Sequence, residues 1–196
     1  MSKKIYIFLG HPNVESLSSH FASVYEAAAK AAGHEVRRTN IGEMQFDPIL
    51  HKGYREIQEL EPDLKKFQED VRWADHVFMI YPLWWLSVPA LLKGLIDRTW
   101  LPGFAFRYHK NKAGKRLLGW DRLLEGRTMR IVTLLSNGPL LVYIAFGDYM
   151  NDFVHGTMGF AGFKTRTSKI GHSEKLTPKQ LAGWEAKIAR LGARGV

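Results

Sequence analysis

Short runs of apolar residues recur along the chain. The runs at 4–10 and 76–81 are rich in isoleucine, valine and aromatic residues, which is typical of strands that are buried on both faces of a sheet. Three further runs, at 35–41, 129–136 and 160–170, give weaker signals of the same kind. The pattern therefore predicts five strands.

Between these runs, apolar residues recur every three or four positions, which is the spacing of the buried face of a helix. In the first such stretch Leu17, Phe21 and Ala28 follow this spacing, and Gly33 stands where a helix C-terminus would place it. Pro89 suits the start of another helix, because its missing N–H would be unpaired in the first turn anyway. The further helices are expected at 57–73, 89–100, 142–153 and 178–191, and an irregular segment is expected at 101–127.

Strands that alternate with helices predict an α/β fold, here a doubly wound five-stranded parallel sheet with helices on both faces. Residues 1–196 are expected to form one domain, since the length suits one core and no linker or repeat interrupts it. The expected strand order is 2-1-3-4-5, in which the first, third and fourth strands are neighbours. Because ligands bind beyond the carboxyl ends of such strands, the loops 10–18, 81–89 and 136–147 are expected to line one crevice.

The composition narrows the chemistry and the location. Cysteine is absent, which excludes a thiol nucleophile, a thiolate zinc site and a cysteine-ligated iron–sulfur cluster, and which fits a reducing compartment. The longest uncharged stretches, 76–92 and 131–147, are shorter than the roughly 20 residues that span a bilayer. A cytoplasmic protein without a transmembrane segment is therefore expected.

The net charge of +9 would attract phosphate groups of a nucleic acid, an anionic lipid or a dinucleotide cofactor. The densest basic run, at 107–116, is either a solvated surface or a contact for a cofactor phosphate or a partner. Charge alone does not choose among these possibilities. No other feature supports nucleic-acid binding, so a nucleic-acid partner is not expected.

The first loop places His11, Ser16 and Ser18 immediately before the N-terminus of a predicted helix. Free backbone N–H groups and the helix dipole favour an anion there, and the two hydroxyls could donate hydrogen bonds to it. This arrangement indicates a phosphate site, although either serine could instead simply cap the helix. The glycine-rich dinucleotide motif and the Walker A lysine loop are both absent from the sequence.

The second loop contains the adjacent tryptophans Trp84 and Trp85, bracketed by Pro82 and Pro89. Indole rings and free backbone amides at the edge of a sheet suit a flat heteroaromatic ligand such as an isoalloxazine, which needs a stacking surface and hydrogen bonds to its polar rim. The alternative is that the indoles pack in the core. Two adjacent side chains, however, cannot easily both point inward.

The third loop begins with Ser136, Asn137 and Gly138, and Tyr143 follows at the start of a predicted helix. The phenol could donate a hydrogen bond to a cofactor or a substrate, or it could simply lie on the helix surface in water. No carboxylate pair, Ser/His/Asp order or metal-ligand spacing accompanies these residues. Hydrolytic chemistry and a metal site are therefore not expected.

Three blocks of sequence carry a resemblance to a known family. They are His11 with the Ser-Leu-Ser run at 16–18, the block PLWWLSVPALLKGLIDR at 82–98, and GFAFRY at 103–108. Together they resemble the NAD(P)H:quinone reductases and their bacterial relatives within the flavodoxin-like superfamily, over nearly the whole chain. The resemblance implies a flavodoxin-like fold and a flavin cofactor, FAD with FMN as the alternative, and NAD(P)H as the co-substrate.

The resemblance also assigns the flavin site to the three loops. In the family, the first loop holds the flavin phosphate or pyrophosphate, the second holds the isoalloxazine, and the third completes the ring site with backbone groups. The implied cofactor-binding residues are His11, Ser16, Leu17, Ser18, Pro82, Leu83, Trp84, Trp85, Leu86, Ser136, Asn137 and Gly138.

Family members are homodimers whose catalytic pocket includes aromatic residues from the other subunit. The residues that would contact the substrate here are Phe106, Tyr108 and Tyr143, of which Tyr143 and Tyr108 are the expected catalytic residues. Two positions depart from the family. Phe146 stands where human-type members have a histidine, which puts a Tyr/His proton relay in doubt. Leu135–Gly138 replaces the more usual Thr-Thr-Gly-Gly, so the side-chain contacts of that loop are expected to differ.

The resulting hypothesis is a flavin-dependent oxidoreductase that takes a hydride from NAD(P)H, releases it, and then reduces a quinone or similar small acceptor, in ping-pong fashion. The main alternative is an ancillary flavoprotein subunit of a bacterial potassium-efflux system, docked on a membrane transporter as a peripheral partner. An electron-carrying flavodoxin fits less well, because such proteins are short and acidic whereas this chain is basic.

Overall fold

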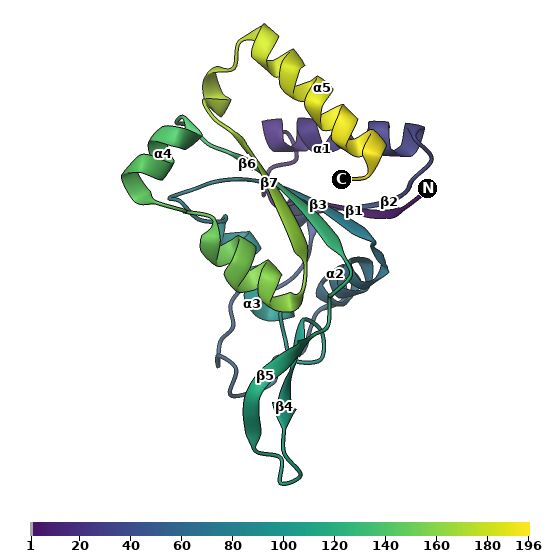
Figure 1. Ribbon diagram of the computed structural model, residues 1–196, viewed down its shortest axis with the longest axis vertical. Coiled ribbons are helices and arrows are strands. Elements are labelled where there is room, and N and C mark those ends of the chain that lie inside the picture. Colours follow the sequence, from purple (N-terminus) through teal and green to yellow (C-terminus); the bar gives the residue numbers. More distant parts are fainter. Residues whose placement is uncertain (1) are drawn as a thin grey trace.

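A parallel sheet of five strands lies at the centre of the protein (Figure 1), of which the computed structural model describes residues 2–196. The strands are β1 (Lys4–Leu9), β2 (Glu35–Asn40), β3 (His76–Pro82), β6 (Thr128–Leu134) and β7 (Lys164–Ile170). They lie in the order β2-β1-β3-β6-β7, and every neighbouring pair is parallel. The predicted strand order 2-1-3-4-5 is therefore confirmed.

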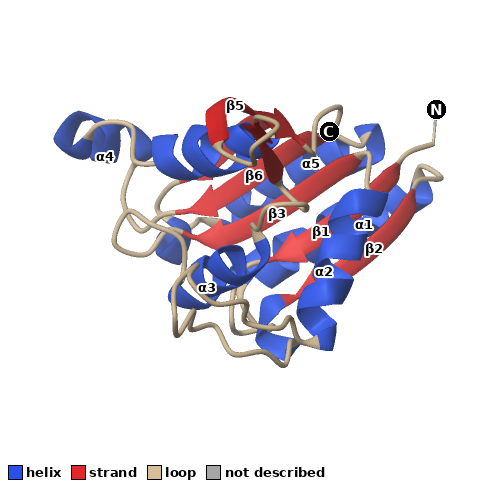
Figure 2. Ribbon diagram, turned by 90° about the horizontal axis from the view of Figure 1, so that it is seen from below, coloured by secondary structure: helices blue, strands red, loops and turns tan. Residues whose placement is uncertain are grey.

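Helices cover both faces of the sheet (Figure 2). Alternate side chains of β3 point to opposite faces, so Phe78 and Ile80 pack with α1 and α5, whereas Val77 and Met79 pack with α2 and α3. The covering helices are α1 (Leu17–Ala31), α2 (Pro62–Trp73), α3 (Ala90–Thr99) and α5 (Pro178–Arg194). This arrangement confirms the predicted α/β class with helices on both faces of the sheet.

The segment 101–127, expected to be irregular, contains an antiparallel hairpin that projects from the body of the protein (Figure 1). Its strands are β4 (Phe106–Lys110) and β5 (Arg116–Arg122). Tyr108 lies opposite Trp120, whose indole stacks on Phe160 at a centroid distance of 4.4 Å. The prediction was wrong because the basic residues of this hairpin face solvent and hide the strand pattern.

The predicted helix at 142–153 is also wrong, because two helical segments replace it. They are α4 (Pro139–Phe146) and the π-helical η2 (Asp152–Gly159). Gly147 separates them with a φ of +77°, a conformation that a residue with a Cβ rarely adopts. Residues 160–161 are still helical, so the last strand begins at Lys164 instead of at residue 160.

The loop that precedes α2 is longer than expected, because this helix begins at Pro62 and not at residue 57. Proline fits the first helical position and fixes the boundary there. Two short 3₁₀ turns, η1 (Ile41–Glu43) and η3 (Ser173–Lys175), complete the elements. None of the helices within residues 2–196 is both long and apolar enough to span a bilayer.

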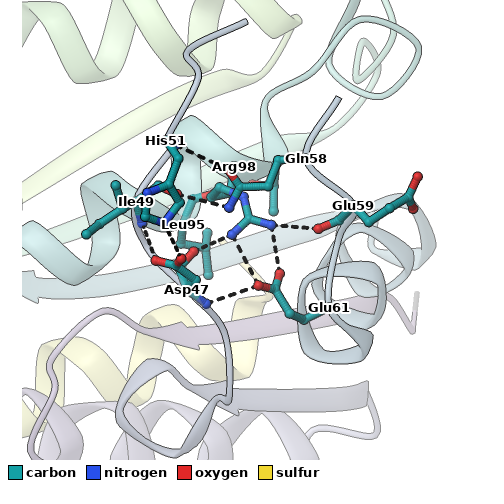
Figure 3. Close-up of polar contacts among 9 residues, drawn as sticks. Asp47, Ile49, His51, Gln58, Glu59, Glu61, Leu95 and Arg98 are labelled. Carbon is teal, nitrogen blue, oxygen red and sulfur yellow. Dashed lines mark hydrogen bonds and ion pairs between the residues drawn. The ribbon is translucent and has the colours of Figure 1, made fainter. Parts of the chain in front are cut away.

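The side chain of Arg98 anchors the loop 44–61 on α3 (Figure 3). Its guanidinium is only 1% exposed and donates to the carboxylate of Glu61 at 2.9 and 3.2 Å. It also donates to the backbone carbonyls of Asp47 and, at 2.7 Å, of Glu59. One buried cation thus fixes both ends of a loop that has no regular secondary structure of its own.

Candidate active site

Three loops meet at the carboxyl edge of the sheet, and backbone hydrogen bonds tie each to the neighbouring strand. The N–H of Gly10 donates to Ile80 at 2.8 Å, that of Leu83 to Leu134 at 2.8 Å, and that of Leu135 to Ile170 at 2.8 Å. Each loop therefore leaves the sheet beside the next one. The prediction that the loops after β1, β3 and β6 are neighbours is confirmed.

Side chains of the first two loops are in direct contact. The imidazole of His11 meets the indole of Trp84 edge to face, with ring centroids 5.6 Å apart. The backbone N–H of Asn13 donates to Nδ1 of His11 at 2.9 Å, and burial lowers the pKa of the imidazole. A neutral His11 whose Nδ1 accepts carries its proton on Nε2, which remains able to donate to a ligand.

The start of α1 has the features of an anion site. Ser16 is the N-cap, and its hydroxyl oxygen accepts a hydrogen bond from the N–H of Ser19 at 3.3 Å. The first helical turn contains no acidic residue, and the N–H groups of Leu17 and Ser18 have no partner within the helix. Ser18 is buried, with the whole residue only 1% exposed. The structure therefore does not expose the Ser18 hydroxyl that was expected to donate to an anion.

Replacing Ser16 by alanine is expected to lower the free energy of unfolding of the protein by about 1 kcal/mol. The reason is that the N–H of Ser19 loses its only capping acceptor. Equilibrium urea denaturation measures the change. Ser16→Asp keeps an acceptor at the same position and should retain the stability, so equal losses in both variants would contradict the capping role.

The second loop makes a tight turn that displays both tryptophans. Trp84 and Ser87 exchange backbone hydrogen bonds at 3.0 and 2.9 Å. Trp85 and Leu86 between them have φ values of +50° and +62°, which non-glycine residues seldom adopt. Trp85 is completely exposed and Trp84 is 45% exposed. The alternative that these indoles pack in the core is wrong, whereas Pro82 is buried and Leu83 half-buried.

The third loop is held by the segment that follows β7. Ser136 donates its hydroxyl hydrogen to Glu174, and the carbonyl of Asn137 accepts from the N–H of His172 at 3.4 Å. Gly138 caps α4 and lies against His172, since a Cβ on this glycine would come within 3.2 Å of the imidazole. The third loop can therefore offer backbone groups to a ligand, whereas the Ser136 hydroxyl is already hydrogen-bonded to Glu174.

Two glycines outside the predicted site support its loops. A Cβ on Gly42 would lie 1.9 Å from the carbonyl oxygen of Pro12 in the first loop. A Cβ on Gly171 would lie 2.4 Å from Pro139 and 3.0 Å from the carbonyl oxygen of Asn137 in the third loop. The loops can approach only because these positions lack a side chain, and no sequence pattern marked them.

Helix α4 carries Tyr143, which is 52% exposed, and the helix projects from the sheet (Figures 1 and 2). Val142 is its only buried residue. Its exposed apolar face, called here the α4 patch, comprises Leu140, Leu141, Tyr143, Ile144 and Phe146. The α4 patch borders the third loop, because α4 begins directly after Gly138, so Tyr143 lies near that loop and is exposed to solvent.

The predicted substrate residues Phe106 and Tyr108 lie away from the three loops of their own chain, on the projecting hairpin (Figure 1). The whole of α3, roughly 15 Å long, separates the second loop from this segment. Phe106 packs on Tyr108 and Phe160 with centroids 4.9 and 5.1 Å apart, and the guanidinium of Arg116 lies 3.3 Å above the Tyr108 ring. A single chain therefore does not bring Phe106 and Tyr108 to its own three loops.

Residues 3–194 match the model of a protein family that is described by its flavodoxin-like fold. The chain belongs to the flavodoxin-like fold family. Among similar proteins, YcaK of Escherichia coli (strain K12), named an uncharacterized NAD(P)H oxidoreductase, is 28% identical over an alignment 180 residues long, and the match covers 85% of this chain and 91% of that protein. The ribosyldihydronicotinamide dehydrogenase (quinone) of Pongo abelii is 25% identical over an alignment 223 residues long, gaps included, and the match covers 96% of this chain and 92% of that one.

A solved structure with the same flavodoxin-like fold is the NAD(P)H:quinone oxidoreductase from Methanothermobacter marburgensis. It superimposes with a TM-score of 0.78 at 22% identity and covers 99% of this chain and 97% of its own. The predicted family and fold class are confirmed by these matches. The relatives carry oxidoreductase names and not those of transporter subunits, in agreement with the prediction of an oxidoreductase.

Proposed function

We propose that this protein is a flavin-dependent NAD(P)H oxidoreductase that reduces a quinone or similar small acceptor. The observation that carries the proposal is the contact between His11 and Trp84, because it joins a helix N-terminus suited to phosphate with an exposed aromatic surface suited to a flat ring. A bound flavin would supply two-electron transfer from NAD(P)H to the acceptor, in two separate half-reactions. The family resemblance favours FAD over FMN.

The residues present fit such a cofactor. Nε2 of His11, the hydroxyl of Ser16 and the N–H groups of Leu17 and Ser18 would hold the phosphate, since all of them can donate at the start of α1. Trp84, Trp85 and Leu86 would hold the ring from the second loop, with Pro82 and Leu83 beneath, and Asn137 and Gly138 would offer backbone groups to its rim. These residues would thereby position the ring at the carboxyl edge of the sheet, where a nicotinamide and then a quinone could reach it.

We also propose that residues 1–196 act as one domain and pair as a homodimer. Five exposed apolar side chains on one short helix form a surface that monomeric proteins rarely leave uncovered. The projecting hairpin (Figure 1) holds Phe106 and Tyr108 away from the three loops of their own chain, where a partner chain could use them. In a symmetric pair each chain would contribute Tyr143 to its own pocket and Tyr108 to that of its partner.

Introducing a charge into the α4 patch by Ile144→Glu is expected to convert the dimer to monomers and to reduce quinone reduction at least about tenfold, because burying an unpaired carboxylate is costly. Sedimentation measures the mass, which for the unaltered protein should be twice that of the 22.4 kDa chain. A matched control, Ile57→Glu, makes the same substitution at an isoleucine that is 93% exposed in the loop before α2, outside the hairpin and the α4 patch. An unaltered protein that sediments as a monomer would refute the pairing.

The indole of Trp85 is expected to contribute to flavin binding, so Trp85→Ala should weaken FAD binding about tenfold by removing an aromatic stacking surface. Quenching of flavin fluorescence on titration measures the affinity. Ile57→Ala removes a similarly exposed apolar side chain, 93% exposed, in the loop before α2 and should leave the affinity unchanged. The same affinity in both variants would argue against the second loop as the ring site.

Initial-rate measurements with NADH or NADPH and a simple quinone test the activity. A ping-pong reaction gives parallel double-reciprocal lines when both substrates are varied, and the rate should depend on added flavin. Absence of quinone-dependent NAD(P)H oxidation by flavin-loaded protein would refute the proposed function, and intersecting lines would refute only the ping-pong order.

A further inference from the structure

A second polar site lies at the edge of the sheet opposite the crevice. His76, Thr128 and Lys164 are the first residues of β3, β6 and β7 and are paired in register. A cavity of about 290 Å³ opens beside them and is also lined by Lys3, Arg130 and Arg166. Because each of these strands has seven residues, roughly 20 Å separates this cavity from the three loops. The two sites are therefore distinct.

The charge around this cavity is mainly positive. Lys3, Arg130, Lys164 and Arg166 line it together with Val196, the last residue of the described chain, and the lining contains no aspartate or glutamate side chain. Within residues 2–196, neither Arg130 nor Arg166 forms an ion pair with a carboxylate side chain. Burial, together with Arg166 and Arg194, lowers the pKa of Arg130. Cations that line the same cavity repel one another, and an anion bound among them would offset this repulsion.

Buried polar atoms of the same lining lack hydrogen-bond partners within the described chain. They are Nε2 of His76 and Nε of Arg130, whose side chains share one face of the sheet. His76 is only 2% exposed. Buried polar groups in folded proteins are almost always hydrogen-bonded, so two such atoms beside one cavity indicate a ligand that would satisfy them.

The imidazole of His76 can present an N–H to the cavity. Its Nδ1 lies 2.8 Å from the hydroxyl of Thr128, which can either accept or donate a hydrogen bond. Burial, followed by the charges of Lys3, Arg130 and His34, lowers the pKa of His76 to about 3, so the ring is neutral at physiological pH. When Thr128 donates to Nδ1, the single ring proton is on Nε2 and is available to an acceptor.

We propose that this cavity binds a phosphate group, either as the free ion or as a small monoester. Arg130 and Arg166 would supply charge-assisted hydrogen bonds, Lys3 a further cation, and Nε2 of His76 a neutral donor, which together match the acceptor oxygens of a tetrahedral anion. The volume equals roughly nine or ten water molecules, enough for a phosphate with a short substituent. No phenyl or indole ring lines the cavity, whereas Trp84 and Trp85 lie at the proposed flavin site.

Titration with inorganic phosphate or glycerol phosphate, at constant ionic strength set by chloride, tests the proposal. The imidazole NMR resonances of His76, assigned with His76→Gln, should shift and saturate with at least one of the two probes. The tighter of the two identifies the free ion or the monoester as the ligand. The titration itself uses the unaltered protein, and His76→Gln serves only to assign the resonances. The shift of His76 does not depend on flavin binding, so its failure would be distinguishable from a failure of the proposed function.

Four variants locate the binding site. Arg130→Gln and Arg166→Gln should each weaken it about tenfold, which is the effect of one charge-assisted hydrogen bond. Arg190→Gln changes the charge equally at an exposed position of α5 and should alter the affinity less than twofold. Ser16→Ala probes the first loop and should leave the His76 shift intact. An unresponsive His76, equal effects of Arg130→Gln and Arg190→Gln, or loss of the shift in Ser16→Ala would overturn the proposal.

Discussion

Replacing Arg98 by methionine is expected to lower the free energy of unfolding by about 3 kcal/mol. The guanidinium is almost completely buried and donates to the Glu61 carboxylate and to two backbone carbonyls of the loop 44–61. Methionine fills much of the same volume but leaves the carbonyls of Asp47 and Glu59 without the guanidinium donor, and the Glu61 carboxylate with only the N–H of Asp47, at 3.1 Å. Glu61 is 30% exposed, so water can solvate part of its charge, which keeps the loss near the lower end for a broken buried pair. Urea denaturation measures the loss.

A control on the same helix separates this effect from the loss of a surface charge. Lys93 pairs with Asp97 at 2.7 Å one turn away, but its side chain is 59% exposed. Lys93→Met should therefore change the stability by no more than about 0.5 kcal/mol. Similar losses in the two variants would show that Arg98 does not anchor the loop in the way the contacts indicate.

Gly42→Ala is expected to weaken FAD binding at least about tenfold and to destabilise the fold by about 1–3 kcal/mol. The new Cβ would lie 1.9 Å from the carbonyl oxygen and 2.7 Å from the carbonyl carbon of Pro12. Backbone atoms cannot rotate away as a side chain does, so the first loop must move as a unit. That movement displaces His11 and the start of α1, on which the proposed phosphate site depends.

Gly183→Ala is the matched control, because this glycine lies in α5 with nothing within 4 Å of the added carbon. The change should leave FAD binding intact and raise the stability by up to about 1 kcal/mol through helix propensity. Flavin titration and urea denaturation follow both variants. If Gly42→Ala binds FAD as tightly as Gly183→Ala, the first loop does not hold the cofactor phosphate.

The central strands were predictable because burial on both faces leaves a continuous apolar run. β3 is the clearest case, since all seven of its residues are buried. The hairpin was not predictable in this way, because only Phe106 and Tyr108 signal β4 among basic residues that lie in solvent. The break after α4 was hidden for a different reason. The apolar run ends at Gly147, and only its left-handed backbone shows that the helix stops there.

The location of the candidate site was predicted from the strand order. The strand order was itself predicted from the alternation of strand and helix patterns along the chain. What the sequence could not reveal are contacts between distant segments. The approach of Gly42 to Pro12 and of Gly171 to Pro139 depends on how η1 and the end of β7 pack against the loops. The bonds of Arg98 to residues 37 to 51 positions away depend in the same way on tertiary packing.

The most direct test of the proposed function is the identity and amount of flavin bound by the protein. The purified chain, incubated with FAD and FMN and freed of excess ligand, is heated, and the released cofactor is measured by absorbance and mass. We expect one flavin per chain, with the mass of FAD. Release of FMN alone would correct the choice of cofactor, and a protein that retains neither flavin would contradict the central claim.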